Sequence, residues 1–354
     1  MDPDGAIKVL IVDDNRMTRR IISMALGADP GIAVVGEAAG GPEAISRIKA
    51  LRPDLVTMAA DLPAMSGLDA IERIMAQCPV PILMVAARIG VRTAFAAISK
   101  GALDVLELPA EVAAPWPALV KKVRLLARVD IQAHLASMKI RGTAPVPAPA
   151  PMPVRAEPKR RSGAGLSLVA IAASTGGPQA LQAILSRLPA SFPWPIVVSQ
   201  HMTTGFSKGM TDWLDGNAAL EVREAVHGDR LRPGRVYINP PEYSMRITGE
   251  AMIHLEEPGA KLIYHPSCDF MLHSVAKAYR DHAAAAILTG MGSDGVAGMR
   301  AVKAGGGLTL AQDEATSVVF GMNRLAVEAQ CIDQVLALDD LAGELLRLAD
   351  SAAE

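Results

Sequence analysis

Short apolar segments alternate with segments of helical periodicity along the first part of the chain. The apolar segments are rich in Val, Ile and Leu, as strands covered on both faces are, and lie at residues 8–14, 32–38, 54–60, 81–87 and 104–109. Segments with apolar positions three and four apart, typical of helices, lie at residues 15–27, 41–52, 67–78 and 92–101. A last helix is predicted from Trp116 to Arg141. This alternation predicts a parallel sheet with right-handed crossovers.

A second alternating unit begins at Leu166. Its clearest strands are predicted at residues 166–174, 195–201, 283–290 and 308–312, and its clearest helices at 178–188, 270–280, 296–305 and 340–350. Between them, residues 219–257 hold shorter apolar runs that we expect to form short strands or hairpins. The chain is therefore predicted to be an α/β protein with two doubly wound parallel-sheet domains.

A Pro/Ala-rich segment, residues 142–165, separates the two units. It holds too little apolar material for a core and is predicted to be an extended, mobile linker. We expect the first domain at residues 1–128, a helical extension with this linker at 129–165, and the second domain at 166–354. The cluster Lys159-Arg160-Arg161 is either a nucleic-acid or membrane patch or three solvated charges, and the second interpretation is favoured.

Composition narrows the functional classes. Half of the 354 residues are hydrophobic and 20% are charged, an ordinary globular balance, and the formal net charge of -2 does not indicate a nucleic-acid-binding surface. Cys78, Cys268 and Cys331 form no CxxC pair, and the N-terminus has no signal-peptide character. No apolar run reaches the roughly 18 residues of a membrane span. We expect a soluble cytoplasmic protein that neither inserts into a membrane nor uses a metal or cofactor.

The serine at position 174 follows the first predicted strand of the second unit, where open parallel sheets bind their ligands. It precedes two glycines that permit a tight turn, and Pro178, which suits the first position of a helix. The helix N-terminus would favour developing negative charge beside Ser174. This pattern resembles a nucleophile elbow, although Ala172 stands where that motif has glycine. A plain turn or a phosphate-binding loop is the alternative.

A histidine and an aspartate follow two other predicted strands. His201 directly follows a strongly apolar strand, and it either caps the sheet or acts as a base. Asp294 lies in the glycine-rich loop 289–295, and it is the N-cap of the next helix, a carboxylate that faces a ligand, or both. Ser, His and Asp at three strand ends are the groups of a serine hydrolase, in which the imidazole takes the serine proton and the carboxylate orients the imidazole.

At these residues the second unit resembles the catalytic domain of the chemotaxis receptor protein-glutamate methylesterases, the CheB family. The STGG turn at 174–177, the QHM segment at 200–202 and the GMGSDG loop at 290–295 match its motifs in order. Two further matching segments are HPSCD at 265–269 and AQDEATSVVFGM at 311–322. That family also has a receiver domain and a linker in front of its catalytic domain, so the resemblance covers the whole chain.

The resemblance implies hydrolysis of glutamate methyl esters on chemoreceptors, with release of methanol, and deamidation of certain receptor glutamines. It implies that Ser174 attacks the ester carbonyl, that His201 is the base, and that Asp294 orients His201. It also implies that the backbone N–H of Met291 binds the oxyanion. Two residues of the STGG turn are expected to support this oxyanion site: Thr175 and Gly176. The expected partners are methyl-accepting chemotaxis receptors, with a chemotaxis kinase or another regulator as a further partner.

The first unit resembles a response-regulator receiver without its phosphorylation chemistry. The acidic pair Asp13-Asp14 is present after the first strand, but Ala59 stands at the position of the phospho-acceptor aspartate. The positions that usually hold a hydroxyl residue and a lysine hold Ala86 and Leu108. We therefore expect a pseudo-receiver that accepts no phosphoryl group and binds Mg²⁺ weakly, because a carboxylate ligand is missing.

Alternatives stay open for both units. An active methylesterase is the leading hypothesis for the chain, and the others are a non-catalytic adaptor that binds receptors and a general serine esterase. In the receiver, Asp61 lies two residues after Ala59 and is the alternative acceptor. In receivers that position offers its backbone carbonyl to the metal, so the absence of phosphorylation is favoured.

Overall fold

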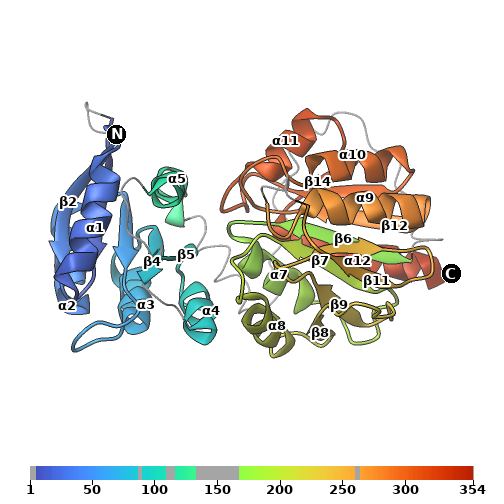
Figure 1. The fold of residues 1–354 in the computed structure, drawn as a ribbon, viewed down its shortest axis with the longest axis horizontal. Coiled ribbons are helices and arrows are strands. Elements are labelled where there is room, and N and C mark those ends of the chain that lie inside the picture. The colour runs from blue at the N-terminus through green and yellow to red at the C-terminus, as the bar shows by residue number, and fades with distance from the viewer. Residues whose placement is uncertain (1–4, 87–89, 109–115, 133–166, 260–263, 354) are drawn as a thin grey trace. The chain divides into compact units, whose positions relative to one another are not determined.

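The computed structural model describes residues 5–86, 90–108, 116–132, 167–259 and 264–353. The chain forms two compact units, residues 1–138 and 139–354 (Figure 1). The predicted linker, residues 142–165, lies outside the described residues, so its mobility and the predicted domain boundaries stay predictions.

The first unit is built on a five-stranded parallel sheet in the order β2-β1-β3-β4-β5, which is the flavodoxin-like order. Its strands are β1 (Ile7–Val12), β2 (Ile32–Ala38), β3 (Leu55–Met58), β4 (Ile82–Ala86) and β5 (Asp104–Glu107). Its helices are α1 (Arg16–Gly27), α2 (Gly41–Leu51), α3 (Gly67–Gln77), α4 (Val91–Ser99) and α5 (Pro117–Leu126). The predicted alternation of strand and helix is confirmed throughout this unit.

The long helix predicted from Trp116 to Arg141 is wrong as one continuous element. Helix α5 ends at Leu126, and a new helical turn begins at Ile131. The Asp130 carboxylate accepts a hydrogen bond from the backbone N–H of Gln132 at 3.0 Å. An aspartate side chain that accepts a hydrogen bond from nearby backbone N–H groups replaces hydrogen bonds of a continuous helix. It therefore favours the end of one helix and the beginning of another. Residues 133–141 lie outside the described residues.

The second unit is built on a seven-stranded parallel sheet in the order β14-β13-β12-β6-β7-β9-β8. Its strands are β6 (Leu168–Ala173), β7 (Ile196–Gln200), β8 (Glu221–Glu224), β9 (Arg235–Ile238), β12 (Ala283–Ile287), β13 (Leu308–Gln312) and β14 (Gln334–Leu336). Strands β10 (Ser244–Ile247) and β11 (Ile253–Glu256) form a separate antiparallel pair. The short strands predicted in residues 219–257 are therefore confirmed, and two of them extend the main sheet.

Helices cover both faces of this sheet, which explains why β6, β7, β12 and β13 are buried along their whole length. In Figure 1 one group of helices lies above the sheet and another below it. The upper group is α9 (Cys268–Tyr279), α10 (Val296–Ala304) and α11 (Met322–Glu328), with the short 3-10 helix η1 (Arg280–His282) after α9. The lower group is α7 (Gly177–Leu185) and α8 (Ser207–Asp215), and α12 (Leu338–Ala353) packs against α7.

The topology gives the second unit a natural binding edge at the end of β6. The chain leaves β6 for β7 on one side and later returns to β12 on the other side. Such a reversal of strand order opens a crevice beyond the carboxyl ends of the strands, and open α/β sheets bind ligands there. The loops that follow β6, β7 and β12 all reach this edge.

Helices α9 and α10 pack unusually closely above that edge. A Cβ atom added to Gly298 in α10 would lie 2.4 Å from the Cβ atom of Leu272 in α9. Glycine is therefore required at position 298 for the close approach of the two helices.

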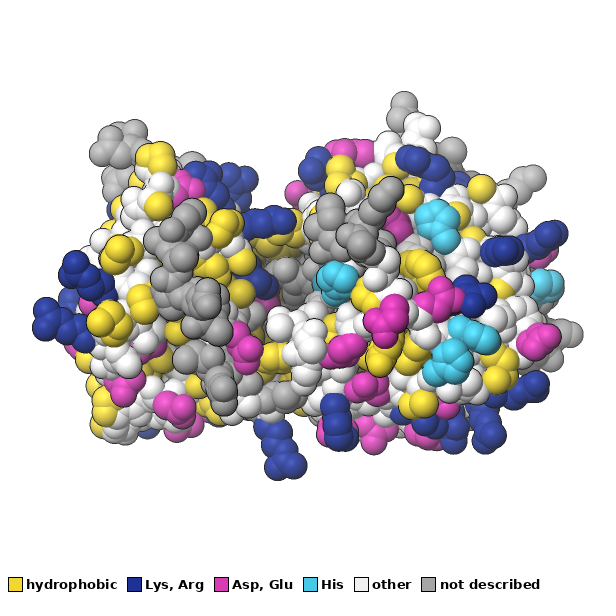
Figure 2. Space-filling model, viewed as in Figure 1, with side chains coloured by type: hydrophobic (Ala, Val, Ile, Leu, Met, Phe, Trp, Pro, Cys, Tyr) yellow, Lys and Arg dark blue, Asp and Glu magenta, His cyan; other side chains and the backbone are white. Residues whose placement is uncertain are grey.

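Two features of the described chain, helix length and surface charge, bear on membrane insertion. No helix within the described ranges is long and apolar enough to cross a membrane. Basic and acidic side chains are interspersed over both units on the face drawn in Figure 2.

The α9–α10 contact predicts the effect of two matched glycine substitutions. Gly298→Ala should destabilise the second unit by about 1–3 kcal/mol, because the methyl group overlaps Leu272. Gly343 lies exposed in α12, and an added Cβ atom would meet nothing within 4 Å. Gly343→Ala should therefore stabilise the unit by about 0.5–1 kcal/mol. Calorimetric unfolding of the full-length variants measures both, and equal stabilisation by both would contradict the packing argument.

Candidate active site

The Ser174 turn is fixed by hydrogen bonds from three directions. The Ser174 N–H donates to the carbonyl of Thr289 at 3.0 Å. The Ser174 carbonyl accepts from the N–H of Gly177 at 2.7 Å and from Nε2 of Gln200 at 2.9 Å. The same Nε2 donates to the carbonyl of His201 at 2.8 Å, so Gln200 joins the serine turn to the histidine.

Both glycines of the turn are required by its geometry. Gly176 has a φ of +79°, and an added Cβ atom would lie 2.6 Å from Cβ of Val318. A Cβ atom on Gly177 would lie 1.8 Å from Oε1 of Gln200. The STGG sequence therefore fits a tight turn in which Val318 and Gln200 leave no room for a side chain at either glycine. Helix α7 begins at the second of these glycines, Gly177.

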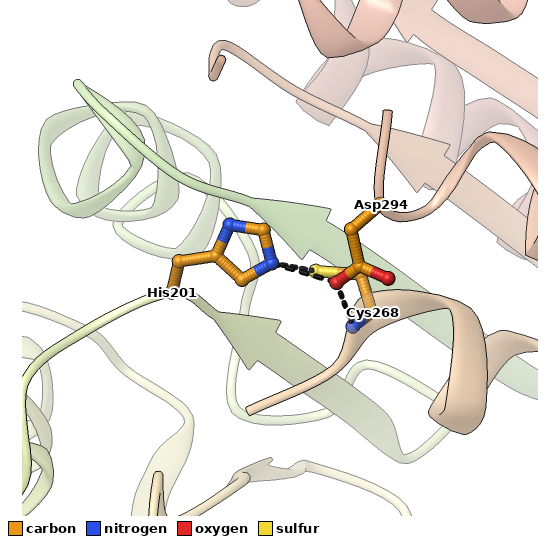
Figure 3. A group of neighbouring side chains, drawn as sticks. All are labelled: His201, Cys268 and Asp294. Carbon is orange, nitrogen blue, oxygen red and sulfur yellow. Dashed lines mark hydrogen bonds and ion pairs between the residues drawn. The ribbon is translucent and has the colours of Figure 1, made fainter. Parts of the chain in front are cut away.

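His201 and Asp294 form a direct hydrogen bond at the same edge. Residues Ala173 and Gln200 are paired between β6 and β7, so Ser174 and His201 follow adjacent strand ends. The ring Nε2 of His201 lies 2.7 Å from Oδ2 of Asp294 (Figure 3). The two side chains are 12% and 5% exposed, so this bond is largely shielded from water.

The Asp294 carboxylate has four donors. Oδ2 accepts from His201 and from the N–H of Cys268 at 2.6 Å, and Oδ1 accepts from Oγ of Ser267 at 3.1 Å and from the N–H of Asp269 at 3.0 Å. Burial alone would raise the pKa of Asp294, but the hydrogen bonds from His201 and the two backbone N–H groups outweigh it and lower the pKa. Asp294 is therefore an anion at neutral pH and holds the Nε2 proton of His201.

Asp294 and Asp269 exchange helix caps. Asp294 binds the N–H groups at the start of α9, and Oδ1 of Asp269 accepts from the N–H groups of Gly295 at 2.9 Å and Gly298 at 2.7 Å at the start of α10. The sequence-based alternative, in which Asp294 caps the helix that follows it, is therefore wrong. The carboxylate instead caps α9, whose Asp269 lies 25 residues earlier in the chain, and the left-handed Gly295 is the N-cap of α10.

The loop after β12 lies against the nucleophile turn. A Cβ atom on Gly290 would lie 2.6 Å from Cβ of Ser174, which places the next residue, Met291, beside the serine. Within the described ranges the Met291 N–H has no hydrogen-bond partner. Thr289 supports the turn from the same loop, because its Oγ1 donates to the carbonyl of Thr175 at 2.9 Å. The oxyanion roles of Met291, Thr175 and Gly176 fit this arrangement and stay predictions.

The predicted nucleophile and base follow adjacent strands but share no hydrogen bond among the described residues. Among the described residues, no hydrogen bond joins the Ser174 hydroxyl to the His201 ring. Because Nε2 of His201 faces Asp294, Nδ1 is the ring nitrogen left to accept a proton. Such contacts are often loose in a free enzyme and tighten when substrate binds.

Several residues of the site were missed by sequence reasoning. The Tyr264 ring stacks on His201, with centroids 5.0 Å apart and planes 14° apart, and so limits the rotation of the imidazole. Ser267 is the N-cap of α9, and a serine before an apolar helical run is a signal that sequence analysis can use. No local signal indicates that Ser267 and Thr289 also serve Asp294 and the serine turn.

The corresponding edge of the first unit is apolar at the three positions where a receiver binds its phosphoryl group. Ala59 follows β3 and is 6% exposed, and Ala86 ends β4. The Leu108 N–H donates to the Ala86 carbonyl at 2.9 Å, so these positions follow neighbouring strands. Asp13 is 5% exposed and burial raises its pKa, whereas Asp14 is exposed. The edge thus keeps one buried acid, and the loss of phosphorylation stays a prediction.

Comparisons with known proteins agree with this architecture. The family description "CheB methylesterase" matches residues 169–345, and "Response regulator receiver domain" matches residues 9–114. A Paramagnetospirillum magneticum protein named "Protein-glutamate methylesterase/protein-glutamine glutaminase 3" is 44% identical over 98% of each chain. A protein of Anaeromyxobacter dehalogenans with the same name and the number 2 is 41% identical over 98% of each chain. The chain belongs to the CheB methylesterase family.

A solved structure supports the fold of the catalytic unit of this CheB family member. The Thermotoga maritima CheB methylesterase catalytic domain is 39% identical, with a TM-score of 0.51, and the match covers 52% of this chain and 98% of that chain. The family matches confirm the resemblance inferred from the motifs, and the two parallel sheets confirm both predicted folds. The assignment of individual site residues stays a prediction.

The four-donor carboxylate predicts how Asp294→Asn changes stability with pH. At pH 7 this variant should have a free energy of unfolding about 1.5–3 kcal/mol lower than that of wild type. The amide that replaces the carboxylate has an NH₂ group in place of one acceptor oxygen, and this group faces N–H donors that it cannot bind. The folded pKa of Asp294 lies below its ordinary value of 3.8, so the stabilisation is present above that value and is lost as the pH falls through the folded pKa. Denaturant unfolding of both proteins at several pH values should show the difference shrink below about pH 4. A difference that stays constant in acid would show that the charge contributes nothing.

Proposed function

We propose that this CheB family member hydrolyses methyl esters of glutamate side chains on chemotaxis receptors and releases methanol. The hydrogen bond between Nε2 of His201 and Oδ2 of Asp294, next to the Ser174 turn, carries the proposal. It supplies an oriented, partly shielded base at the strand ends where a serine precedes a helix N-terminus. The names of the relatives at about 40% identity support the choice of substrate.

The acylation step follows from the orientation of the ring. Oγ of Ser174 attacks the ester carbonyl carbon while its proton passes to Nδ1 of His201. The Nε2 proton stays on the ring and bonded to Asp294, whose negative charge stabilises the imidazolium that forms. The carbonyl oxygen becomes an oxyanion beside the N–H of Met291 and the N-terminus of α7.

Collapse of the tetrahedral intermediate breaks the bond to the methoxy group. Methanol leaves with the proton from Nδ1 of His201, and the glutamyl group remains as an ester of Ser174. Water then gives a proton to the same nitrogen and attacks this ester, and Ser174 recovers its proton as glutamate is released. A glutamine substrate would form the same acyl-enzyme with ammonia as the leaving group, so we include deamidation in the proposal.

The alternatives differ in what they require of the site. A receptor-binding adaptor needs neither the charged Asp294–His201 pair nor the glycine-constrained serine turn, and a general esterase would need no receptor. Methanol release from a methylated receptor, compared with hydrolysis of a simple aryl ester, separates these functions from the proposed one. If the protein hydrolyses the aryl ester but releases no methanol from the receptor, the result would support the proposed triad and contradict the proposed substrate.

We also propose that the receiver unit acts without phosphorylation. A methyl group at Ala59 forms no acyl phosphate, and neither Ala86 nor Leu108 supplies a group that binds one. Control of the esterase would then depend on a binding partner, such as the chemotaxis kinase or another regulator, that distinguishes two arrangements of the chain.

Ser174→Ala should abolish methanol release, with a loss of at least about 10³-fold in rate. His201→Ala should be similarly impaired, and the double variant should be no slower than either single variant, because the residues act as a unit. Ser186→Ala is the matched control, since this exposed serine ends the same helix, α7, away from the strand edge. Circular dichroism checks the folding of each variant. Normal methanol release by Ser174→Ala would refute the mechanism.

Acetyl phosphate with Mg²⁺ should neither label the chain nor change its esterase rate. Ala59→Asp alone should not restore regulation, because Ala86 and Leu108 still lack groups that bind the phosphoryl oxygens. The measurement is acid-labile phosphate on the protein, together with methanol release. A hydroxylamine-sensitive adduct on the wild-type chain that disappears in Asp61→Asn would contradict this prediction and identify Asp61 as the acceptor.

A further inference from the structure

A nitrogen, an oxygen and a sulfur ligand atom meet at the catalytic pair. Nε2 of His201, a carboxylate oxygen of Asp294 and Sγ of Cys268 all lie within 4.8 Å of one another (Figure 3). The Nε2–Oδ2 distance is 2.7 Å and the Nε2–Sγ distance is 3.5 Å. Within the part of the chain that the structure describes, no other group of three His, Cys, Asp or Glu side chains is this compact. The proposed ester hydrolysis makes no use of the Cys268 thiol.

These three ligand types suit Zn²⁺. Zinc binds His nitrogen and carboxylate oxygen at about 2.0–2.2 Å and thiolate sulfur at about 2.3 Å, which puts tetrahedral ligand atoms roughly 3.3–3.6 Å apart. The Nε2–Sγ distance of 3.5 Å already has this value. The Nε2–Oδ2 distance of 2.7 Å must open by about 0.6–0.9 Å, because one hydrogen bond is replaced by two metal bonds.

We propose that His201, Cys268 and Asp294 form an inhibitory binding site for Zn²⁺. The binding of the ion follows from the ligand geometry alone, whereas its inhibitory effect rests on the proposed function. Cys268 is the essential ligand of this site, because the Ser, His and Asp side chains alone offer no thiolate. A thiolate ligand favours Zn²⁺ over Mg²⁺. Mg²⁺ requires six oxygen ligands in a near-octahedral array, which this N, O and S set does not provide.

The inhibition follows from where the imidazole proton lies. In the free site the proton is on Nε2 and faces Asp294, so Nδ1 holds the lone pair that accepts the Ser174 proton. A zinc ion on Nε2 needs that lone pair, so the ring proton moves to Nδ1 and the base is lost. The Cys268 thiol releases its proton to solvent as the thiolate binds, and no oxidant or reductant is involved.

Two features of the site limit the affinity. Burial raises the pKa of the Cys268 thiol well above its ordinary value, so the metal competes with a firmly held proton. Asp294 already accepts four hydrogen bonds and must share an oxygen with the metal. We therefore expect a reversible site that is weaker than a closed structural zinc site.

The first test is a Zn²⁺ titration of methanol release by the full chain, with Mg²⁺ as the comparison ion. Wild type and Cys78→Ser, whose substitution lies in the first unit, should lose activity at the same Zn²⁺ concentration. Cys268→Val and Cys268→Ala should require at least about tenfold more Zn²⁺, each measured against its own metal-free rate. Equal sensitivity of the Cys268 variants and wild type would overturn the proposal.

The second test does not depend on activity. Co²⁺ added to the full chain should give a thiolate-to-metal charge-transfer band that Cys78→Ser keeps and Cys268→Val loses. If the Cys268 variants fail to fold, His201→Ala should weaken or lose the band, and an unchanged band there would show that the metal does not need His201 and would refute the three-ligand site. A band in a chain that releases no methanol would leave the metal site standing and refute only the proposed function.

Discussion

The carboxylate of Asp294 connects the chemistry of the catalytic domain to its fold. A buried charge is costly unless hydrogen bonds replace its water, and here four donors do so. Three of them belong to the first residues of α9, so this helix cannot shift without leaving the charge poorly paired. Asp269 extends the constraint to α10, which α9 contacts at Gly298. The orientation of the His201 ring therefore depends on how two helices pack above the sheet.

Backbone contacts, and not charge, position Ser174, the predicted nucleophile. Thr289 accepts the Ser174 N–H and donates to the Thr175 carbonyl, and Gln200 binds the carbonyls of Ser174 and His201. These contacts require three strand-end loops to approach within touching distance, which only glycine at the crowded positions allows. The same close approach places the thiol of Cys268 beside the His201 imidazole, so the packing that orients this ring also brings together the three side chains of the proposed zinc site.

The two domains use the same edge of a parallel sheet in different ways. In the catalytic domain the strand ends carry polar groups that are paired with one another. In the receiver the equivalent edge carries Ala59, Ala86 and Leu108. The strands behind it are nevertheless paired in parallel as predicted, β3 with β4 and β4 with β5. The receiver fold thus forms with alanine at position 59, which is compatible with the proposal that a partner and not phosphorylation controls the esterase.

Periodicity in the sequence determined the parallel α/β class, and turn residues determined the STGG turn. The same patterns placed Ser174, His201 and Asp294 after strands. All of these features depend on residues close in sequence. The end of α5 was missed, because Asp130 starts a new helical turn. Tertiary structure alone decided that Asp294 caps α9, that Tyr264 stacks on His201, and that Cys268 joins them. The His201–Asp294 bond spans 93 residues and the Cys268–Asp294 bond spans 26, so both depend on strand order and on the approach of α9 to the sheet, which local patterns do not specify.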